Sequence, residues 1–238
     1  MVFSDPTTNS GIVEQTRSIM RVDSTQWPAY QVANSCNNWL DTVTGYAIGA
    51  DRNFQWDDTN HSKLPEGTTD LTAAQKDYSF LTDEQGNSIL NLTRIDILDP
   101  DGSYRELKLI DQANIKKALD EYKSTNGLPE QYDKIADNIV RLYPAPATSV
   151  TAGLKFYFQR TGSYFVPTDT TKEPGVSPLL HRGFVIASAY DGAMTLGLEN
   201  VSALQVEMEK EELKMKQYFE IRNTDMNRRF SPFKQDNR

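Results

Sequence analysis

The sequence predicts an α+β protein: an antiparallel helical bundle with an inserted β-sandwich-like module. Near both ends of the 238-residue chain, apolar residues recur at three- and four-residue spacing, which is typical of amphipathic helices. From about residue 51 to 172 the pattern changes to short runs of branched and aromatic residues between turn-forming residues, which favours strands. We therefore expect residues 1–50 and 173–221 to form the two halves of the bundle, and residues 222–238 to form an extended tail.

Two helices are predicted in the first 50 residues. The first spans Ser10 to Val22, with the Ser10 hydroxyl as a candidate N-terminal cap. The second begins at Pro28, because proline is well suited to the first helical position, and we expect it to end at Gly49. Neither helix can bury its apolar stripe alone, so both are expected to pack on helices from the last third of the chain.

The middle of the chain predicts strands and a hairpin. The polar stretch from Asp51 to Lys76 is expected to be a loop. Strands are expected over "DYSFL", "LNLTRIDILD", "YDKIADNIVRLYP" and "AGLKFYFQRT". Pro100 and Gly102 predict a tight hairpin turn, because proline sets φ and glycine accepts a positive φ. A short helix is predicted between Asp111 and Gly127.

Two further helices are predicted in the last third. The first follows Ser177, a candidate cap, and has Pro178 at its first position. It is apolar nearly all round, so we expect it to be buried. The second, "ENVSALQVEMEKEELKMKQYFEIR", carries charged residues on most faces and one apolar stripe. The stripe consists of Val201, Leu204, Met208, Met215 and Tyr218.

Composition and charge narrow the functional classes. The chain has no run of about 18 apolar residues that would predict a membrane-spanning helix, and its first residues do not resemble a signal peptide. A single cysteine excludes an internal disulfide, which is usual for intracellular proteins. Net charge is −8; residues 222–238 carry +3, so the preceding 221 residues carry −11. Such an acidic body repels nucleic-acid phosphates, and the basic tail is either a docking arm or a solvated end.

The sequence contains few candidate catalytic residues. The two histidines, His61 and His181, lie far apart in the sequence, and no metal-ligand spacing is present. We expect His181 to be a residue at a helix start whose ring is satisfied by a neighbouring carbonyl, and Cys36 to be a small core residue rather than a nucleophile. No glycine-rich phosphate loop or nucleophile elbow occurs. We therefore predict no enzyme activity, no cofactor and no metal.

Two alternatives remain open at this stage. In a wall hydrolase, the carboxylate pairs Glu66 with Asp70, or Asp57 with Asp58, would act on a glycosidic bond, but sequence cannot show that they converge.

In a carbohydrate-binding β module, Trp56, Tyr78 and Tyr104 would form a flat exposed platform. The "KFYFQR" run (Lys155–Arg160) mixes aromatic and basic residues as single-strand binders do, but its alternation is already explained by a half-buried strand.

The ordered set of motifs resembles one known family. It is carried by "GLPEQYDKIADNIVRLYPAPATSVTAGLKFYFQR" (Gly127–Arg160) and "DTTKEPGVSPLLHRGFVIASAYDGA" (Asp169–Ala193), with "FQWDDTNHSKLPEG" and "DYSFL" before them. Together these segments resemble the head-to-tail adaptor, or connector, proteins of tailed bacteriophages, which include tail tubular protein A and the head completion proteins. The similarity extends from about Ser10 to Ala193 and rests on the order of the motifs rather than on any single one.

The resemblance implies a structural virion protein of the head–tail neck, present in the host cytoplasm during assembly. Such subunits form a homo-oligomeric ring, usually of twelve, on the portal protein, and stopper, tail-tube or tail-terminator proteins follow on the tail side. The ring would continue the channel for double-stranded DNA without sequence-specific binding, and no membrane is involved. Another neck or tail ring component, such as a tail-completion protein, remains an alternative.

The resemblance also assigns a role to the C-terminal tail. The C-terminal tail would dock on the portal, and its basic and aromatic residues are typical interface anchors. These are Arg222, Arg228, Arg229, Phe230, Phe233 and Lys234. The "YPAP" corner would carry a strand back across the β module, with Tyr143 packed and Pro144 and Pro146 fixing the path of the chain.

Overall fold

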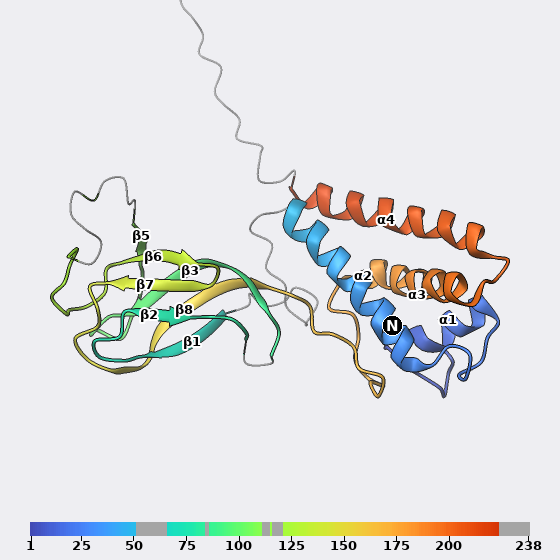
Figure 1. Ribbon diagram of the computed structural model, residues 1–238, viewed down its shortest axis with the longest axis horizontal. Helices are drawn as coiled ribbons and strands as arrows, with labels where there is room; N and C mark the ends of the chain where they lie inside the picture. The colour runs from blue at the N-terminus through green and yellow to red at the C-terminus, as the bar shows by residue number, and fades with distance from the viewer. Residues whose placement is uncertain (51–65, 84–85, 111–114, 116–120, 224–238) are drawn as a thin grey trace, which may run out of the picture. The chain divides into compact units, whose positions relative to one another are not determined.

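The computed structural model describes residues 1–50, 66–83, 86–110, 115 and 121–223. In this part of the chain it contains four α-helices and two four-stranded sheets, so the predicted α+β class is confirmed (Figure 1). The chain divides into two compact units. The helical unit comprises Met1–Phe54 and Tyr164–Arg238, and the β unit comprises Gln55–Ser163.

The helical unit is organised around one central helix. It contains α1 (Ile12–Met20), α2 (Ala29–Ala50), α3 (His181–Leu196) and α4 (Val201–Asn223), and the short 3-10 helix η2 (Pro178–Leu180) leads into α3. Helix α3 contacts each of the other three α-helices (Figure 1). The two N-terminal helices therefore pack on the C-terminal ones, as predicted.

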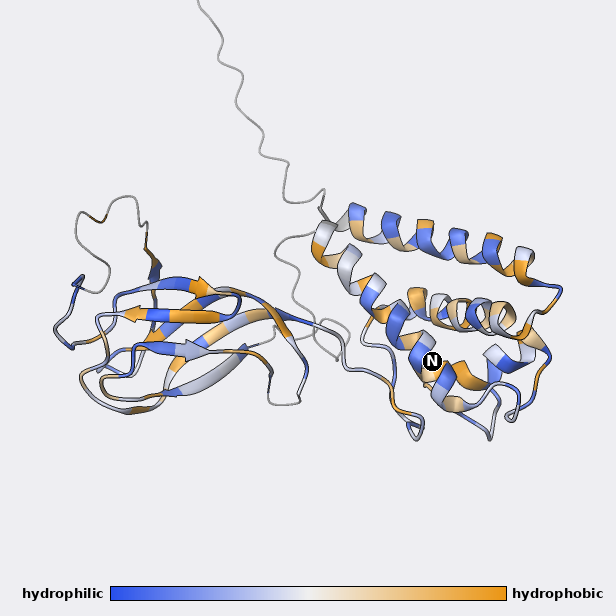
Figure 2. Ribbon diagram, viewed as in Figure 1, coloured by the Kyte–Doolittle hydropathy of each residue, from blue (hydrophilic) through white to orange (hydrophobic). Residues whose placement is uncertain are grey.

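Hydropathy separates the two C-terminal helices. Most side chains of α3 are buried, as its nearly continuous apolar sequence predicted. Helix α4 buries one stripe, which includes Leu204, Met215 and Phe219, and its exposed face is largely hydrophilic (Figure 2).

Helix ends differ from the predictions. Gly11, not Ser10, occupies the N-cap of α1, and the Ser10 hydroxyl donates instead to the carboxylate of Asp5. Helix α2 continues through Gly49 to Ala50, because an exposed helical glycine costs only about 1 kcal/mol and does not by itself end a helix. Ser177 precedes η2 but makes no side-chain capping bond.

Two glycines let α3 approach its neighbours closely. A Cβ atom on Gly183 would lie 2.9 Å from the indole Nε1 of Trp39 in α2. A Cβ atom on Gly192 would lie 2.4 Å from the sulfur of Met20 in α1. Both separations are shorter than van der Waals contact, so a side chain at Gly183 would displace the rigid indole of Trp39, and one at Gly192 would displace the flexible end of Met20.

The β unit contains two sheets. The first has the order β1 (Glu66–Leu71), β8 (Val150–Arg160), β3 (Ile89–Leu98) and β4 (Tyr104–Glu106), with all neighbours antiparallel. The second has the order β2 (Asp77–Ser79), β7 (Ile139–Tyr143), β6 (Gln131–Ala136) and β5 (Lys108–Leu109), with β5 parallel to β6.

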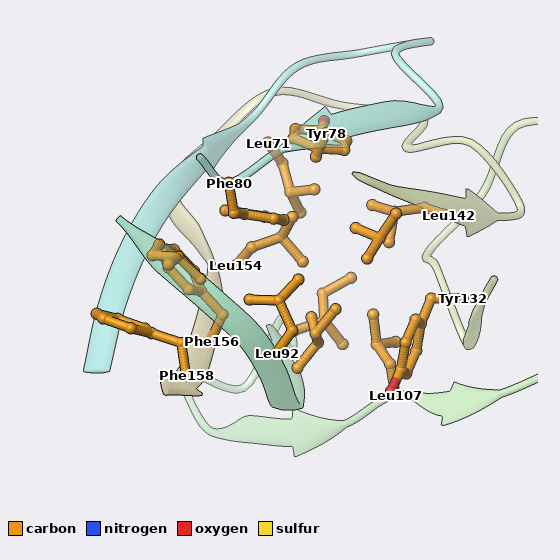
Figure 3. Packing of buried hydrophobic residues seen from close by; sticks show 14 residues of the cluster. Leu71, Tyr78, Phe80, Leu92, Leu107, Tyr132, Leu142, Leu154, Phe156 and Phe158 are labelled. Atoms are coloured by element: carbon orange, nitrogen blue, oxygen red, sulfur yellow. The ribbon is translucent and has the colours of Figure 1, made fainter. Parts of the chain in front are cut away.

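Both sheets contribute to one cluster of buried side chains (Figure 3). On β8, Phe156 and Phe158 point into the cluster, whereas Lys155 and Tyr157 lie on the other face. The prediction of a half-buried strand over "KFYFQR" is therefore confirmed. The rings of Phe80 and Phe156 meet at a centroid separation of 4.3 Å, which closes the cluster beside β2.

The turn after β3 forms as predicted. The backbone N–H of Asp99 donates to the Ser103 carbonyl, and Gly102 has φ of +86°. Of the helix predicted from Asp111 to Gly127, residues 111–114 and 116–120 lie outside the described residues. Residues 121–123 form a turn, and Gly127 bridges to Pro146, so no helix extends to Gly127.

Strand β1 lies inside the stretch that we predicted to be a loop. Its sequence, "EGTTDL", contains one apolar residue, Leu71, which is also its one fully buried side chain. Because β1 is an edge strand, pairing with β8 and an ion pair between Glu66 and Lys155 hold it rather than an apolar face. The prediction was wrong because alternation of apolar residues was the signal that we used.

The boundary between the units also differs from the prediction of residue 172. The segment from Tyr164 to Lys172 belongs to the helical unit. The Phe165 ring stacks on Phe3 at a centroid separation of 5.0 Å, and the side chain of Asn37 in α2 exchanges two hydrogen bonds with the Phe165 backbone. Phe165, which follows the last strand, therefore attaches this segment to the helical unit through Phe3 and Asn37.

Candidate functional site

His181 begins α3 and is 2% exposed. Its Nε2 atom lies 3.0 Å from the carbonyl oxygen of Val176, and its Nδ1 atom lies 2.9 Å from the Met1 ammonium group. Since a carbonyl only accepts, Nε2 carries the proton and Nδ1 accepts from the ammonium. Burial lowers the pKa of this imidazole, because the charged form would lose its hydration. The predicted role, a ring satisfied by a neighbouring carbonyl, is confirmed.

Cys36 lies on the buried face of α2. Its sulfur is 3.9 Å from the carbonyl oxygen of Phe184, and burial raises the pKa of the thiol far above its usual range. The thiol is therefore protonated and enclosed, as expected of a core residue. The hydrogen-bonding partners of Cys36 and His181 are different backbone groups, so the two side chains do not form a nucleophile–base pair.

The carboxylates proposed for a hydrolase have structural partners. Glu66 forms an ion pair with Lys155 at 2.9 Å, and an Asp70 oxygen accepts from the backbone N–H of Ala152 at 2.7 Å. Both partners lie on β8, so these two carboxylates hold the edge strand β1 in place. Asp57 and Asp58 lie outside the described residues. Among the residues that the structure describes, no group of three or more His, Cys, Asp and Glu side chains is arranged to hold a metal ion.

The aromatic platform expected of a carbohydrate-binding module does not include Tyr78. This side chain is 6% exposed, belongs to the buried cluster, and its hydroxyl oxygen accepts from the backbone N–H of Thr72. Tyr104 is 38% exposed, and its hydroxyl donates to the carbonyl of Ala152. Trp56 lies outside the described residues. The carbohydrate-binding alternative therefore lacks one of the three exposed aromatic residues that it required.

The outer face of the first sheet carries alternating charges. Lys155 pairs with Glu66, and the Arg94 guanidinium lies 2.6 Å from Asp96 and 3.9 Å from Glu106. The hydrogen bond to Glu66 raises the pKa of Lys155, and the bond to Asp96 raises that of Arg94. Both cations are neutralised by neighbours on the same face, which therefore does not offer a cationic surface to nucleic acid.

The "YPAP" corner joins the two sheets. Strand β7 ends at Tyr143 in the second sheet, and β8 begins at Val150 in the first. The Tyr143 side chain is buried, and the Tyr143–Pro144 peptide bond is cis. The Pro146 carbonyl accepts from the backbone N–H of Ala74, at 2.8 Å. This hydrogen bond attaches the corner to the loop after β1, which contains Ala74.

The predicted docking residues follow or end α4. The side chains of Arg222, Arg228, Arg229, Phe230, Phe233 and Lys234 lie outside the described residues. Two sets of contacts fix that helix.

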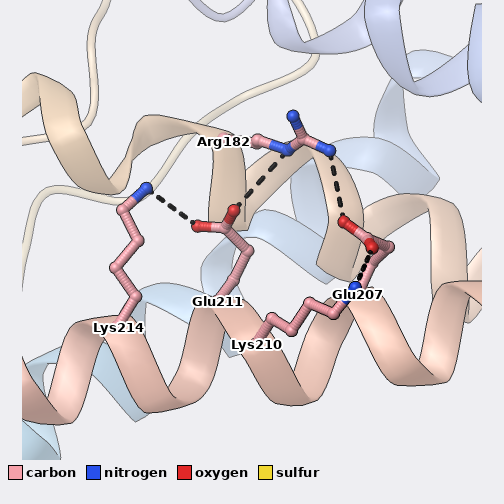
Figure 4. Close-up of polar contacts among 5 residues, drawn as sticks. All are labelled: Arg182, Glu207, Lys210, Glu211 and Lys214. Carbon is pink, nitrogen blue, oxygen red and sulfur yellow. Dashed lines mark hydrogen bonds and ion pairs between the residues drawn. The ribbon is translucent and has the colours of Figure 1, made fainter.

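The first set joins α4 to the start of α3 (Figure 4). The Arg182 guanidinium lies 3.3 Å from Glu207 and 3.5 Å from Glu211, which occupy successive turns of α4. Lys210 and Lys214 add ion pairs to the same two carboxylates, at 2.7 and 3.3 Å. We call these five residues the Arg182 network. The sequence placed charged residues on the faces of this helix outside its apolar stripe, but it did not single out Glu211, which is buried. The signal that could have found it is the four-residue spacing between Glu207 and Glu211.

The second set joins α4 to α2. The Tyr46 hydroxyl donates to Glu212 at 2.7 Å, and Lys216 pairs with the same carboxylate at 2.7 Å. The Lys216 ammonium also lies 4.9 Å from the centroid of the Tyr46 ring. With the buried Phe219 one turn further on, these contacts hold α4 close to the point where the described chain ends.

Comparison with known proteins adds no assignment: no family model matches the chain, and no curated protein matches it. None of the described helices combines the length and the apolar character needed to cross a membrane.

Proposed function

We propose that this chain is a structural virion protein, the head–tail adaptor that joins the portal vertex of a phage capsid to the tail. In this proposal the subunits form a ring, with twelve as the expected number, seated on the portal protein. Stopper or tail-tube and tail-terminator proteins bind on the other side. The helices form an antiparallel bundle, and the two sheets form a sandwich inserted into it.

The observation that carries the proposal is the way α4 is held. The Arg182 network fixes α4 to α3, and Tyr46 with Phe219 fixes it to α2, whereas the basic and aromatic tail follows directly. A tail on a firmly held helix can reach a partner while the body stays folded. Arginine and phenylalanine are residues that interfaces favour, and this supports docking through Arg228, Arg229, Phe230 and Phe233.

Charge supports the proposed channel role. The first 221 residues carry a net charge of −11, so DNA that passes a ring of such subunits would be repelled from its wall rather than held. The paired cations on the outer face of the first sheet agree with this, because they offer no cationic track for the phosphate backbone. We therefore propose no sequence-specific DNA binding and no enzyme activity.

The test is binding to capsids that carry the portal but lack the adaptor, observed by electron microscopy. Full-length protein should add a ring at the portal vertex. A version ending at Asn223 keeps the whole of α4 and should not bind. Phe230→Ala with Phe233→Ala should weaken docking, whereas Asn237→Ala, a truncation in the same tail that removes no aromatic ring, is the control.

Each outcome separates a different part of the proposal. Equal docking of full-length and shortened protein would keep the adaptor role and reject the tail as the anchor. Binding to isolated tails but not to portal-bearing capsids would favour a tail-completion protein instead. If the full-length chain binds neither, the adaptor proposal is contradicted.

A further inference from the structure

A hollow lies between the first turns of α2 and the last turns of α3, within the helical unit. Its volume is about 380 Å³, at the lower end of the range for small-ligand sites. Asn34, Ser35 and Asn38 line it from α2, and Asp191 and Thr195 line it from α3. The helical spacing of three and four residues brings these polar side chains to the same face of each helix.

Three polar side chains of this hollow are without partners among the described residues. Asp191 forms no ion pair, and the side-chain amides of Asn34 and Asn38 form no hydrogen bond, within the part of the chain that the structure describes. The Thr195 hydroxyl does have a partner, since it donates to the Asp191 backbone carbonyl. One half-buried carboxylate and two amide oxygens are therefore available as acceptors.

The lining carries a net negative charge. Asp191 is its one carboxylate, and it contains no lysine, arginine or histidine. An anionic ligand would be repelled by Asp191, whereas a cation would gain a charge-assisted hydrogen bond that no residue of the described chain now makes. Tyr30, at the rim, is 53% exposed, and its ring face can lie against a planar cation.

We propose that this hollow receives an arginine side chain from a partner protein. The guanidinium group would donate to the Asp191 carboxylate, while its remaining N–H groups reach the amide oxygens of Asn34 and Asn38. Arginine fits better than lysine because its planar fork serves several acceptors at once and stacks on an aromatic ring. The inference does not rest on the adaptor function.

A sugar is the main competing ligand for a site that combines a carboxylate, amides and aromatic residues. Sugars bind by stacking on an exposed aromatic face. Trp27, the larger aromatic residue of the hollow, is 3% exposed, and its indole N–H points to the Ser188 hydroxyl at 3.4 Å. Its ring face is thus closed to a ligand, and the negative charge of Asp191 favours the cation.

The test uses the full chain, labelled for NMR, and two probes of nearly equal shape. The first probe is N-acetyl-arginine-N-methylamide. The second is the corresponding citrulline compound, in which the guanidinium is replaced by an uncharged urea. We expect saturable shifts at the backbone amides of Asn34, Ser35 and Asp191 with the arginine probe. The citrulline probe should bind about tenfold more weakly, because a hydrogen bond between charged groups is lost.

Substitutions test whether Asp191 and Asn34 determine the affinity for the arginine probe. Asp191→Asn keeps the size of the side chain and should weaken the arginine probe about tenfold, so that the two probes bind alike. Asn34→Asp adds a second carboxylate at an exposed position and should tighten binding of the arginine probe. Asp137→Asn removes an exposed carboxylate of the β unit and should change nothing, which makes it the matched control.

Three results would overturn the proposal. They are no saturable shift at these amides up to the solubility limit of the arginine probe, equal affinity for both probes in the unaltered chain, and saturable binding of N-acetylglucosamine at the hollow without binding of the arginine probe. Thermal unfolding of each variant shows whether the fold is retained. If Asp191→Asn does not fold, Asn34→Asp decides, because failure to tighten binding then contradicts the proposal.

Discussion

The Nε2 atom of His181 lies 3.0 Å from the carbonyl oxygen of Val176, five residues earlier, inside a helical unit that leaves the ring 2% exposed. The neutral ring satisfies this carbonyl and accepts from the Met1 ammonium group through Nδ1. A second proton would convert Nδ1 from acceptor to donor, and it would place a buried positive charge beside the ammonium. The contact therefore makes stability depend on pH.

The expected direction follows from the lowered pKa of His181. An unfolded chain binds a proton at His181 below about pH 6.5, whereas the folded chain binds it only at lower pH. This contribution is therefore fully present above about pH 6.5 and is lost as pH falls through the folded pKa. His181→Gln, whose amide can still donate to Val176, should reduce the loss of unfolding free energy between pH 8 and pH 5.5 measured in urea. His61→Gln is the control, and equal acid sensitivity of His181→Gln and the unaltered chain would contradict the assignment.

Replacing two helical glycines by alanine should change the free energy of unfolding in opposite directions. Gly183→Ala should lower the free energy of unfolding by about 1–2 kcal/mol, because the new methyl group would overlap the indole of Trp39. Gly45→Ala in α2 should raise it by about 0.5–1 kcal/mol, because nothing lies within 4 Å of the added Cβ atom and alanine favours the helix. Urea unfolding of both variants checks this. A stabilised Gly183→Ala would show that α3 and α2 are not packed as described.

Two ion pairs of the β unit should contribute differently to the free energy of unfolding, because one is buried and the other is largely exposed. Asp83 and Arg160 face each other at 3.4 Å with side chains 8% and 6% exposed, and Asp83 also accepts from the backbone and side-chain nitrogens of Asn87. Asp83→Asn should lower the free energy of unfolding by about 3 kcal/mol, because it removes a charged partner of a buried guanidinium. Asp77→Asn breaks a closer pair with Arg141, at 2.7 Å, but that pair is largely exposed, and the cost should stay below about 1 kcal/mol. An equal or larger loss of unfolding free energy in Asp77→Asn would contradict burial as the property that determines the contribution of these pairs.

A cavity in the core of the β unit should destabilise the β unit without loosening the helical unit. Leu142 is fully buried in the cluster that both sheets share, so Leu142→Ala should cost about 2–5 kcal/mol. Because each unit has its own buried residues, faster hydrogen exchange should appear in peptides from residues 66–163 and not in those from α1 to α4. The exposed Leu81, changed to alanine, is the control. Equally increased exchange in α2 and α3 would show that the units unfold together.

Sequence patterns predicted the elements whose signal is apolar periodicity. Helices α2, α3 and α4 and strands β3 and β8 were found because each buries a continuous face. Strand β1 was missed because it is held by backbone pairing and by the Glu66–Lys155 ion pair, and neither leaves an apolar pattern. The N-cap of α1 was misplaced by one residue, because Ser10 found a partner in Asp5 outside the helix.

At the candidate sites, too, the sequence predicted only features that follow from apolar patterns. The burial of Tyr143, His181 and Cys36 was predicted, because each lies within an apolar stretch. The carbohydrate-binding alternative required an exposed Tyr78, whose burial the sequence could not decide because a three-residue strand is too short to reveal its orientation. The hollow at Asp191 was not predicted, because it depends on which faces of α2 and α3 meet. That meeting is set by Gly183 and Gly192, whose close contacts with Trp39 and Met20 no periodicity can show.

The two sets of contacts on α4 also determine how the helix would respond to a mechanical load. The Arg182 network and the Tyr46–Glu212–Lys216 contacts lie on successive turns, and they attach α4 to two different helices. A pull on the chain beyond Asn223, along the helix axis, would stretch all of these contacts in shear at the same time. Contacts loaded together share the force, whereas contacts peeled one after another each bear it alone. A load on the end of α4 would therefore be divided between α2 and α3.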